Sequence, residues 1–194
     1  MLKNLSDLFL YKNNLYGQFP SVIESLNLTQ IDLAMNMLNG SIPENFGKLQ
    51  QLEVLNLFSN QLSSEISTSI SQIPTLRIFR IYRNNFSGEL PLQLGIHSKL
   101  EAFEVSENKL TGKLSENSCT GGTLFVVVAF SNNLTGEIPG SLERCHRLHK
   151  IQLYDNSFTG EFPSAETNFP VSLRPEWHGI CLDWRLVQQF LLYT

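Results

Sequence analysis

The sequence predicts an α/β solenoid, a right-handed superhelix of repeated coils with a parallel sheet along its concave face. Three observations predict this fold: an asparagine recurs every 23 or 24 residues, apolar residues hold fixed positions before it, and glycine and proline follow it at fixed distances. The recurring asparagines are Asn13, Asn36, Asn60, Asn84, Asn108, Asn132 and Asn156.

The apolar positions predict one short strand in each coil. Leucine stands eight residues before every one of these asparagines, and apolar residues stand five and three residues before it. The positions at minus five and minus three alternate with a polar or variable position, which is the pattern of a strand with one face inward. We expect strands centred near residues 8, 31, 55, 79, 103, 127 and 151, paired side by side in one parallel sheet.

The residues around each asparagine predict how the chain leaves the strand. An asparagine amide both donates and accepts hydrogen bonds, so it can satisfy backbone groups inside the coil, and the seven asparagines should form an inward ladder. Glycine follows at plus four in six coils, with Ser64 as the exception, and permits a close or left-handed turn. Proline at plus seven ends strand pairing and begins the convex side. This unit, LxxLxLxxNxLxGxIP, is a leucine-rich repeat.

Longer segments carry a more specific resemblance. The GxIP element, as in Gly40–Pro43 and Gly136–Pro139, is similar to the plant extracellular type of repeat, and the segments FRIYRNNFSGELP and IQLYDNSFTGEFPS resemble the ectodomains of plant HAESA-like receptor kinases. The resemblance implies a single-pass receptor at the extracellular face of the plasma membrane. It also implies a secreted peptide ligand on the concave face and recruitment of a co-receptor kinase.

The repeat register divides the chain into a solenoid over residues 1–164 and a tail over residues 165–194. The tail is expected to form a short helix, an irregular cap over the last coil, or no selected structure at all. We find no signal peptide, cysteine-paired N-terminal cap, membrane span or kinase motif. The sequence therefore reads as a piece of a longer receptor or as a truncated product.

Candidate ligand-binding residues lie between the inward positions of each strand, where side chains point away from the core onto the concave face. Aromatic residues fill five of seven places two residues before the asparagine, a composition typical of binding surfaces, although aromatics also suit a sheet surface without any ligand. Three arginines on one coil precede three glutamates on the next, so mutual neutralisation is also expected. The candidates are Tyr11, Phe58, Arg80, Tyr82, Arg83, Glu104, Glu107, Phe130, Gln152 and Tyr154.

One site implied by the resemblance is not matched. HAESA-like receptors are expected to hold the peptide's terminal carboxylate with two concave arginines spaced i, i+2. Here Arg80 is followed at that spacing by Tyr82. We expect the carboxylate pocket to lie in other repeats, or the peptide to differ.

The cysteines and the glycosylation sequons indicate the compartment in which the protein would fold. Cys119 and Cys145 fall on the convex side of neighbouring coils, where a disulfide is possible, but we favour two buried free thiols, since free cysteine behaves as a small hydrophobe. Cys181 would then be a further free thiol. N-x-Ser/Thr sequons, which fit a secreted context, occur at Asn4, Asn27, Asn39, Asn85 and Asn133.

Composition and motifs exclude several function classes. The net charge of −4 and pI near 5.6 argue against a nucleic-acid partner. Without a catalytic or metal-ligand motif we expect no enzyme activity, no metal and no cofactor. Besides a peptide receptor fragment, two alternatives remain: a soluble inhibitor of a pathogen's wall-degrading enzyme, and a truncated product without activity of its own.

Overall fold

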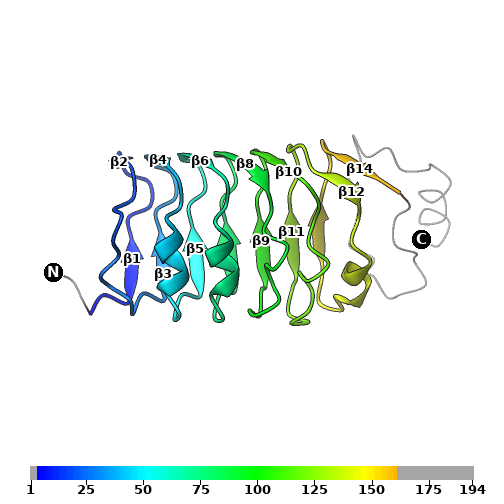
Figure 1. Ribbon diagram of the computed structural model, residues 1–194, viewed down its shortest axis with the longest axis horizontal. Coiled ribbons are helices and arrows are strands. Elements are labelled where there is room, and N and C mark those ends of the chain that lie inside the picture. The colour runs from blue at the N-terminus through cyan, green and yellow to red at the C-terminus, as the bar shows by residue number, and fades with distance from the viewer. Residues whose placement is uncertain (1–3, 161–194) are drawn as a thin grey trace.

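The computed structural model describes residues 4–160, and within that range the chain winds into a solenoid of fourteen short strands and three 3-10 helices (Figure 1). The first strand of each coil joins one parallel sheet in the order β1-β3-β5-β7-β9-β11-β13. These strands are β1 (Asp7–Phe9), β3 (Gln30–Asp32), β5 (Val54–Asn56), β7 (Ile78–Arg80), β9 (Ala102–Glu104), β11 (Val126–Val128) and β13 (Lys150–Gln152). Each contains one of the seven predicted centres, so the predicted sheet is confirmed.

Strand pairing keeps equivalent residues side by side. Leu55 of β5 pairs with Ile31 of β3 on one side and with Phe79 of β7 on the other, and Phe79 pairs in turn with Phe103 of β9. Because the register follows the repeat, a residue type that recurs at one position becomes a continuous column running across the sheet. Every surface feature described below depends on this property.

A second set of parallel strands follows each asparagine and was not predicted. Five of them form a sheet in the order β10-β8-β6-β4-β2, and the last two pair with each other. The strands are β2 (Tyr16–Gly17), β4 (Met37–Gly40), β6 (Gln61–Ser64), β8 (Asn85–Glu89), β10 (Lys109–Thr111), β12 (Thr135–Glu137) and β14 (Ser157–Thr159). Their pairing lets the segment that turns away from the large sheet satisfy its backbone groups against neighbouring coils.

The core is one continuous apolar cluster that runs from Leu28 to Phe158. In the third coil the predicted inward residues Leu52, Leu55, Leu57 and Leu62 have no exposed surface. Burying each such side chain stabilises the fold by roughly 1.5–3 kcal/mol. Since each leucine packs mainly against the coils before and after it, stability is distributed along the solenoid.

The asparagines bind backbone groups of their own coil and of the coil before. The Nδ2 of Asn84 donates to the carbonyl oxygens of Leu57 and Ile81, both at 3.0 Å, while its Oδ1 accepts the amide of Leu62 at 3.0 Å. The same donor and acceptor pattern recurs at Asn36, Asn60, Asn108, Asn132 and Asn156. Asn13 is exposed and bonds carbonyls of its own coil alone among the described residues.

The turn at plus four has the left-handed backbone that its glycines suggest. Gly40 and Gly88 have φ of 75° and 73°, and Ser64 adopts the same conformation with φ of 71°. A Cβ on Gly88 would lie 2.5 Å from Cγ of Glu65, which belongs to the preceding coil, so a larger residue would clash there. The repeat places Ser41 in the same relation to Ser64 as Glu65 has to Gly88. The side chain of Ser41 is much shorter than that of Glu65, so the turn at position 64 has room for a serine.

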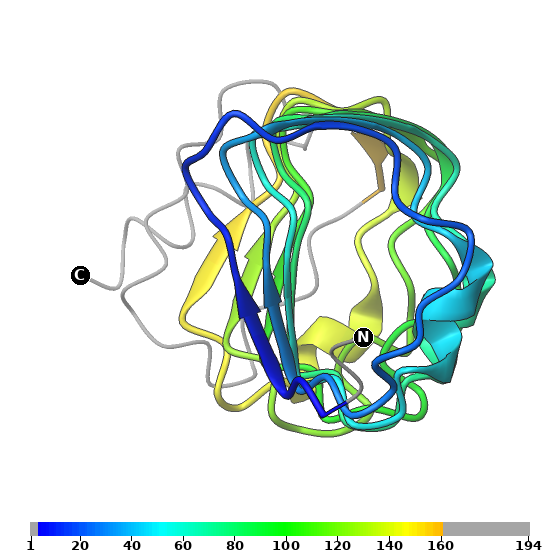
Figure 2. The same ribbon diagram turned by 90° about the vertical axis from the view of Figure 1, so that its left-hand side faces the viewer.

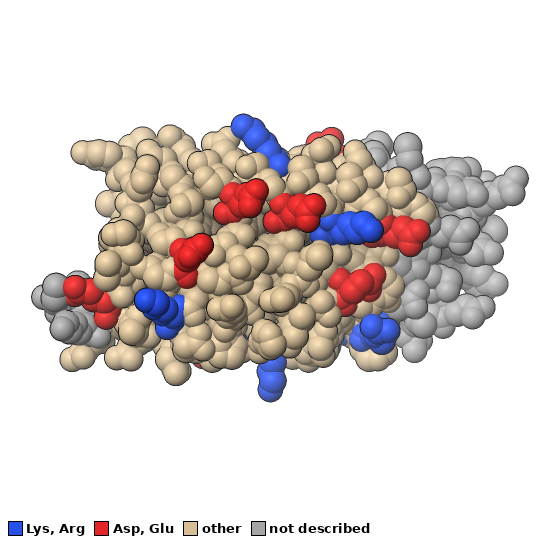
Figure 3. All heavy atoms as spheres, in the orientation of Figure 1, with Lys and Arg blue, Asp and Glu red and all other residues tan. Residues whose placement is uncertain are grey.

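The side opposite the large sheet carries the 3-10 helices η1 (Glu44–Lys48), η2 (Thr68–Gln72) and η3 (Gly140–Arg144). Figure 2 shows the large sheet on one side of the solenoid and the cyan helix η1 on the other. Figure 3 views the helix-bearing side, where acidic and basic side chains are scattered over a mostly uncharged surface. Such a mixture of signs lacks the single basic patch expected of a nucleic-acid interface.

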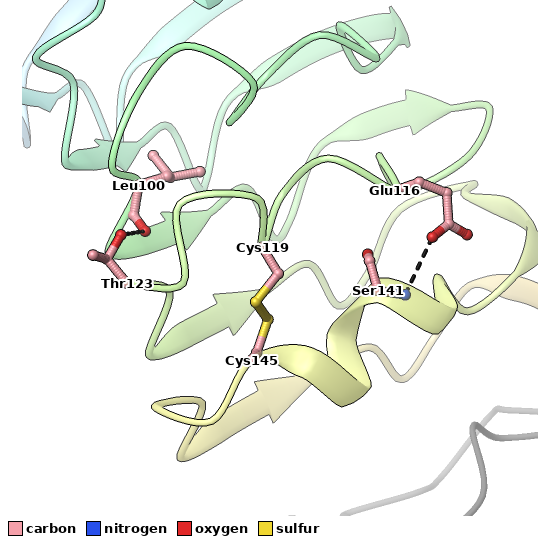
Figure 4. The surroundings of a disulfide bond; sticks show 6 residues. All are labelled: Leu100, Glu116, Cys119, Thr123, Ser141 and Cys145. Carbon is pink, nitrogen blue, oxygen red and sulfur yellow. Dashed lines mark hydrogen bonds between the residues drawn. A yellow bond between two sulfur atoms is a disulfide. The ribbon is translucent and has the colours of Figure 1, made fainter. Parts of the chain in front are cut away.

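On this convex side Cys119 and Cys145 form a disulfide, so the preference for two free thiols was wrong (Figure 4). The physical reason is the repeat itself: positions 26 residues apart fall on adjacent coils, and the two Cα atoms lie 5.6 Å apart, within disulfide range. Beside the bond, the carboxylate of Glu116 accepts the amide of Ser141 in the first turn of η3. The fifth and sixth coils are therefore joined covalently and by a hydrogen bond.

Candidate binding surface

The candidate site is the concave face, by which we mean the outward-facing surface of the large sheet. The tail that was expected over residues 165–194 lies outside the described residues. All ten candidate residues lie within them. Arg80, Glu104 and Gln152 stand in β7, β9 and β13, and Arg83 and Glu107 in the turns that follow two of these strands.

An aromatic column crosses the face two residues before the ladder asparagines, at five of the seven coils, with Ala34 and Ser106 in the other two. The rings of Phe58 and Tyr82 stack with centroids 4.5 Å apart and planes within 5°, and those of Phe130 and Tyr154 stack at 4.6 Å and 7°. Tyr11 is 54% exposed at one end of the column. Stacking holds the two rings of each pair parallel, so each ring covers one face of its partner.

Ion pairs join the arginine-bearing coil to the glutamate-bearing coil. Nε of Arg80 lies 2.6 Å from Oε1 of Glu104, and Arg83 pairs with Glu107 at 3.0 Å. Arg77, outside the candidate set, bridges two acidic neighbours, Glu53 and Glu101, at 3.1 and 3.0 Å. The expected mutual neutralisation is thus present, and each pair is worth at most about 1 kcal/mol because both partners are partly exposed.

Paired charges change what the face offers to a ligand. The Nε–H of Arg80 is already donated to Glu104, which leaves only its two terminal nitrogens for another acceptor. The face is therefore closer to an uncharged surface with aromatic columns than to a cationic pocket.

An apolar patch on the concave face was missed by the sequence reasoning. Ala102, Val126 and Val128 are buried together, with Ile78 and Phe130 packed against them. These residues come from β7, β9, β11 and the turn after β11, at outward positions six, four or two before the asparagine. The signal was present in the column at minus six, where Ile78, Ala102 and Val126 succeed one another on neighbouring strands.

Two ionisable groups of the face are shifted by their surroundings. Partial burial raises the pKa of the Tyr82 phenol above its usual value, and the negative charge of Glu104 raises it further. Hydrogen bonds to Glu101 and Glu53 raise the pKa of Arg77, so its charge is kept. Neither shift brings a group near neutral pH, as a general acid or base would require.

The five sequon asparagines are all exposed. Asn39 lies in β4, Asn85 begins β8, and Asn133 stands two residues before β12. A glycan at any of these three positions would project from the second set of strands rather than from the large sheet.

The described residues also form a hollow, but no metal-binding cluster and no membrane-spanning helix. A shallow polar hollow lies between η1 and η2, lined by residues that include Glu44, Lys48 and Thr68. Residues 4–160 contain no group of three or more histidine, cysteine or acidic side chains placed to hold a metal ion. In the same range no helix has the length and apolar character needed to cross a bilayer.

Comparisons with known proteins agree with the fold. The family model described as Leucine Rich Repeat matches residues 27–49 and 51–73. Receptor-like protein 52 of Arabidopsis thaliana is 51% identical over 72 residues, which is 36% of this chain and 9% of the relative. Receptor-like protein 34 of the same plant is 37% identical over 76 residues, 39% of this chain and 8% of the relative. The chain thus spans about a tenth of the length of these curated relatives.

Solved structures match over most of the chain. The crystal structure of a TDR receptor superposes with a TM-score of 0.82 at 37% identity, covering 93% of this chain and 31% of that one. The Arabidopsis receptor kinase HAESA, solved with the peptide hormone IDA and the co-receptor SERK1, gives 0.76 at 31% identity, covering 84% and 31%. The chain is a leucine-rich-repeat solenoid. The relatives and solved structures named above are plant receptor-like proteins and receptor ectodomains, and nothing in these comparisons points to catalysis. A plant ice-binding protein shares the solenoid fold at 20% identity, with a TM-score of 0.60.

Proposed function

We propose that this chain is the ligand-recognition part of a plant cell-surface receptor and that it binds an extended secreted peptide on its concave face. The observation that carries the proposal is the aromatic column, because rigid aromatic side chains that present large contact area are favoured as anchors in interfaces. The apolar patch around Val126 and Val128 adds contact area beside it. Neutralised charges reduce the cost of desolvating the face.

The dimensions of the face suit such a ligand. Seven strands about 4.8 Å apart extend roughly 30 Å, and an extended chain advances about 3.3 Å per residue. The stretch from β7 to β13, about 15–20 Å, would hold five or six residues. HAESA and other structural neighbours have been solved with peptide hormones, which supports the same class of ligand here.

The remaining elements of the proposal follow from the same resemblance. A co-receptor kinase ectodomain is the proposed second partner, by analogy with the HAESA complex. The proposed location is the extracellular face of the plasma membrane, with glycans on several of the exposed sequons. The disulfide between Cys119 and Cys145 suits that oxidising setting.

The test is selection of a displayed library of random 12-residue peptides on the biotinylated full chain, followed by calorimetry with the enriched peptides. Tyr82→Ala should weaken binding about 5- to 30-fold, the loss of one aromatic anchor. The control is Lys48→Ala in η1, on the opposite side, which should leave affinity unchanged. Binding that survives Tyr82→Ala and Phe130→Ala together but is lost in the control would place the ligand elsewhere. Enrichment of no peptide, with tight binding to a fungal polygalacturonase, would favour the inhibitor function instead.

A further inference from the structure

The segment that joins η3 to β13 concentrates positive charge. Residues 144–150 read RCHRLHK, with three cations, two histidines and no acidic residue, in a chain whose net charge is −4. Cys145 and Leu148 are buried, whereas the basic side chains are exposed. We call this segment the basic turn, and its exposed residues are Arg144, His146, Arg147, His149 and Lys150.

The cations of the basic turn lack the acidic partners that the concave arginines have. Each concave arginine lies within 3.1 Å of a glutamate carboxylate. Arg144, Arg147 and Lys150 form no ion pair with any side chain that the structure describes. One repeat earlier, the equivalent positions hold two threonines and a valine, so the register brings no carboxylate beside these cations. Like charges held close together repel, so a bound anion would lower the electrostatic free energy of the turn.

The backbone of the basic turn is fixed by the core and by the disulfide. The amide of Cys145 donates to the carbonyl of Leu142 at 3.1 Å, and the amide of Leu148 donates to the carbonyl of Cys145 at 2.8 Å. Leu142 and Leu148 are buried in the apolar core, and Cys145 is bonded to Cys119 on the neighbouring coil (Figure 4). A ligand therefore meets a backbone that is already in place, which reduces the entropy lost on binding.

An aromatic pair adjoins these charges. The ring of His149 stacks on that of Phe125, one coil earlier, with centroids 5.4 Å apart and planes 5° apart. In the sequence His149 stands between Arg147 and Lys150. The C–H face of a sugar ring packs well on an aromatic surface, and the carboxylate of a uronic acid pairs with a guanidinium or an ammonium group. Cations beside aromatic rings therefore favour an acidic sugar polymer over an acidic peptide.

We propose that the basic turn binds an acidic polysaccharide, a polyuronate, whose carboxylates pair with Arg144, Arg147 and Lys150 and whose sugar rings pack on the Phe125–His149 pair. Each exposed ion pair is weak, but several carboxylates on one polymer bind together, so their contributions combine. The inference goes beyond the proposed peptide recognition, which uses other residues, and does not depend on it.

The first test is calorimetry of the full chain, with its disulfide intact, against decagalacturonate at low ionic strength. The decamer should bind, and its affinity should fall at least tenfold in about 0.5 M sodium chloride, because salt screens exposed charges. The methyl-esterified decamer keeps the rings but not the charges and should bind at least tenfold more weakly. Absence of binding, equal binding of the esterified decamer, or equal or tighter binding of polyglutamate or single-stranded DNA of the same charge would overturn the proposal.

The second test separates the basic turn from the overall charge of the chain. The triple variant Arg144→Gln, Arg147→Gln and Lys150→Gln should bind decagalacturonate at least tenfold more weakly. A matched control removes the same charge from three exposed lysines elsewhere and should leave the affinity unchanged. Its substitutions are Lys48→Gln, Lys109→Gln and Lys113→Gln. Equal losses in the two triple variants would refute a site at the basic turn.

The third test concerns the aromatic pair. Phe125→Leu keeps an apolar side chain but removes the ring, so it should weaken decagalacturonate binding at least threefold and leave polyglutamate binding unchanged. If that variant does not fold, His149→Gln removes the other ring and should have the same effect. Full retention of affinity in the folded variant would refute the packed sugar ring. Tyr82→Ala, on the concave face, should leave decagalacturonate binding unchanged, and a loss there with none in the basic-turn variant would place the polymer on the concave face instead.

Discussion

Replacing Asn84 by alanine removes hydrogen bonds that join two coils. The side chain donates to the carbonyl of Leu57 in the preceding coil and accepts the amide of Leu62. In the variant the Leu57 carbonyl keeps its bond from Asn60, whereas the Leu62 amide loses its acceptor. Unsatisfied backbone groups of this kind cost about 1–3 kcal/mol in the free energy of unfolding. We expect Asn84→Ala to lower stability by that amount in urea denaturation followed by circular dichroism.

A matched control exists at the same repeat position. Asn13 makes the local bonds to Leu10 and Tyr11 but none to another coil among the described residues. Asn13→Ala should therefore cost clearly less than Asn84→Ala, and the difference measures the bonds between coils.

Hydrogen exchange locates the effect. The amide of Leu62 should exchange faster in Asn84→Ala, while that of Leu38, which is bonded to Asn60, should keep its protection. A loss of stability within about 0.3 kcal/mol, or unchanged protection of Leu62, would contradict the view that the ladder holds adjacent coils together.

Three further predictions concern other parts of the chain. Ser64→Gly should raise the free energy of unfolding by about 0.5–1 kcal/mol in urea denaturation, because it relieves a left-handed backbone at φ of 71°; a loss would contradict this. Reduction of the Cys119–Cys145 disulfide should cost about 3–4 kcal/mol for its 26-residue separation, measured by denaturation with and without dithiothreitol, and Cys119→Ser should abolish the difference. In ultraviolet titration the Tyr82 phenol should ionise above its usual pKa of about 10, and Glu104→Gln should lower that pKa. Because the folded state holds the phenol proton more tightly than the unfolded state, the contribution of Tyr82 to stability should fall as pH rises beyond about 10.

The large sheet was predictable because its signal lies in side chains. Leu52, Leu55 and Leu57 must all reach one core, and their spacing fixes both the strand and its inward face. The second set of strands was not predictable in the same way. Its segments, such as Gln61–Ser64, pair through backbone groups and contain few residues that indicate a strand.

Backbone conformation also escaped prediction at the residue before each asparagine. Lys12, Met35, Arg83 and Glu107 all adopt φ between 54° and 56° there. Six residue types occupy this position in the seven coils, so the geometry is imposed by the coil and not by local preference. The candidate residues were identified from their phase in the repeat. Which of them pair with one another depends on the register between coils, which the structure supplies.

The arrangement of the ion pairs makes one junction of the solenoid specific. The arginines Arg77, Arg80 and Arg83 all lie on the fourth coil. Each pairs with a glutamate at the equivalent repeat position of the fifth coil. Repeat proteins gain and lose whole units, and most junctions here join apolar or neutral columns that would tolerate such a change. Loss of the fifth coil would instead set Arg77, Arg80 and Arg83 beside Phe125, Val128 and Ser131. Apart from the disulfide-linked fifth and sixth coils, units can therefore be exchanged more freely elsewhere in this solenoid than between its fourth and fifth coils.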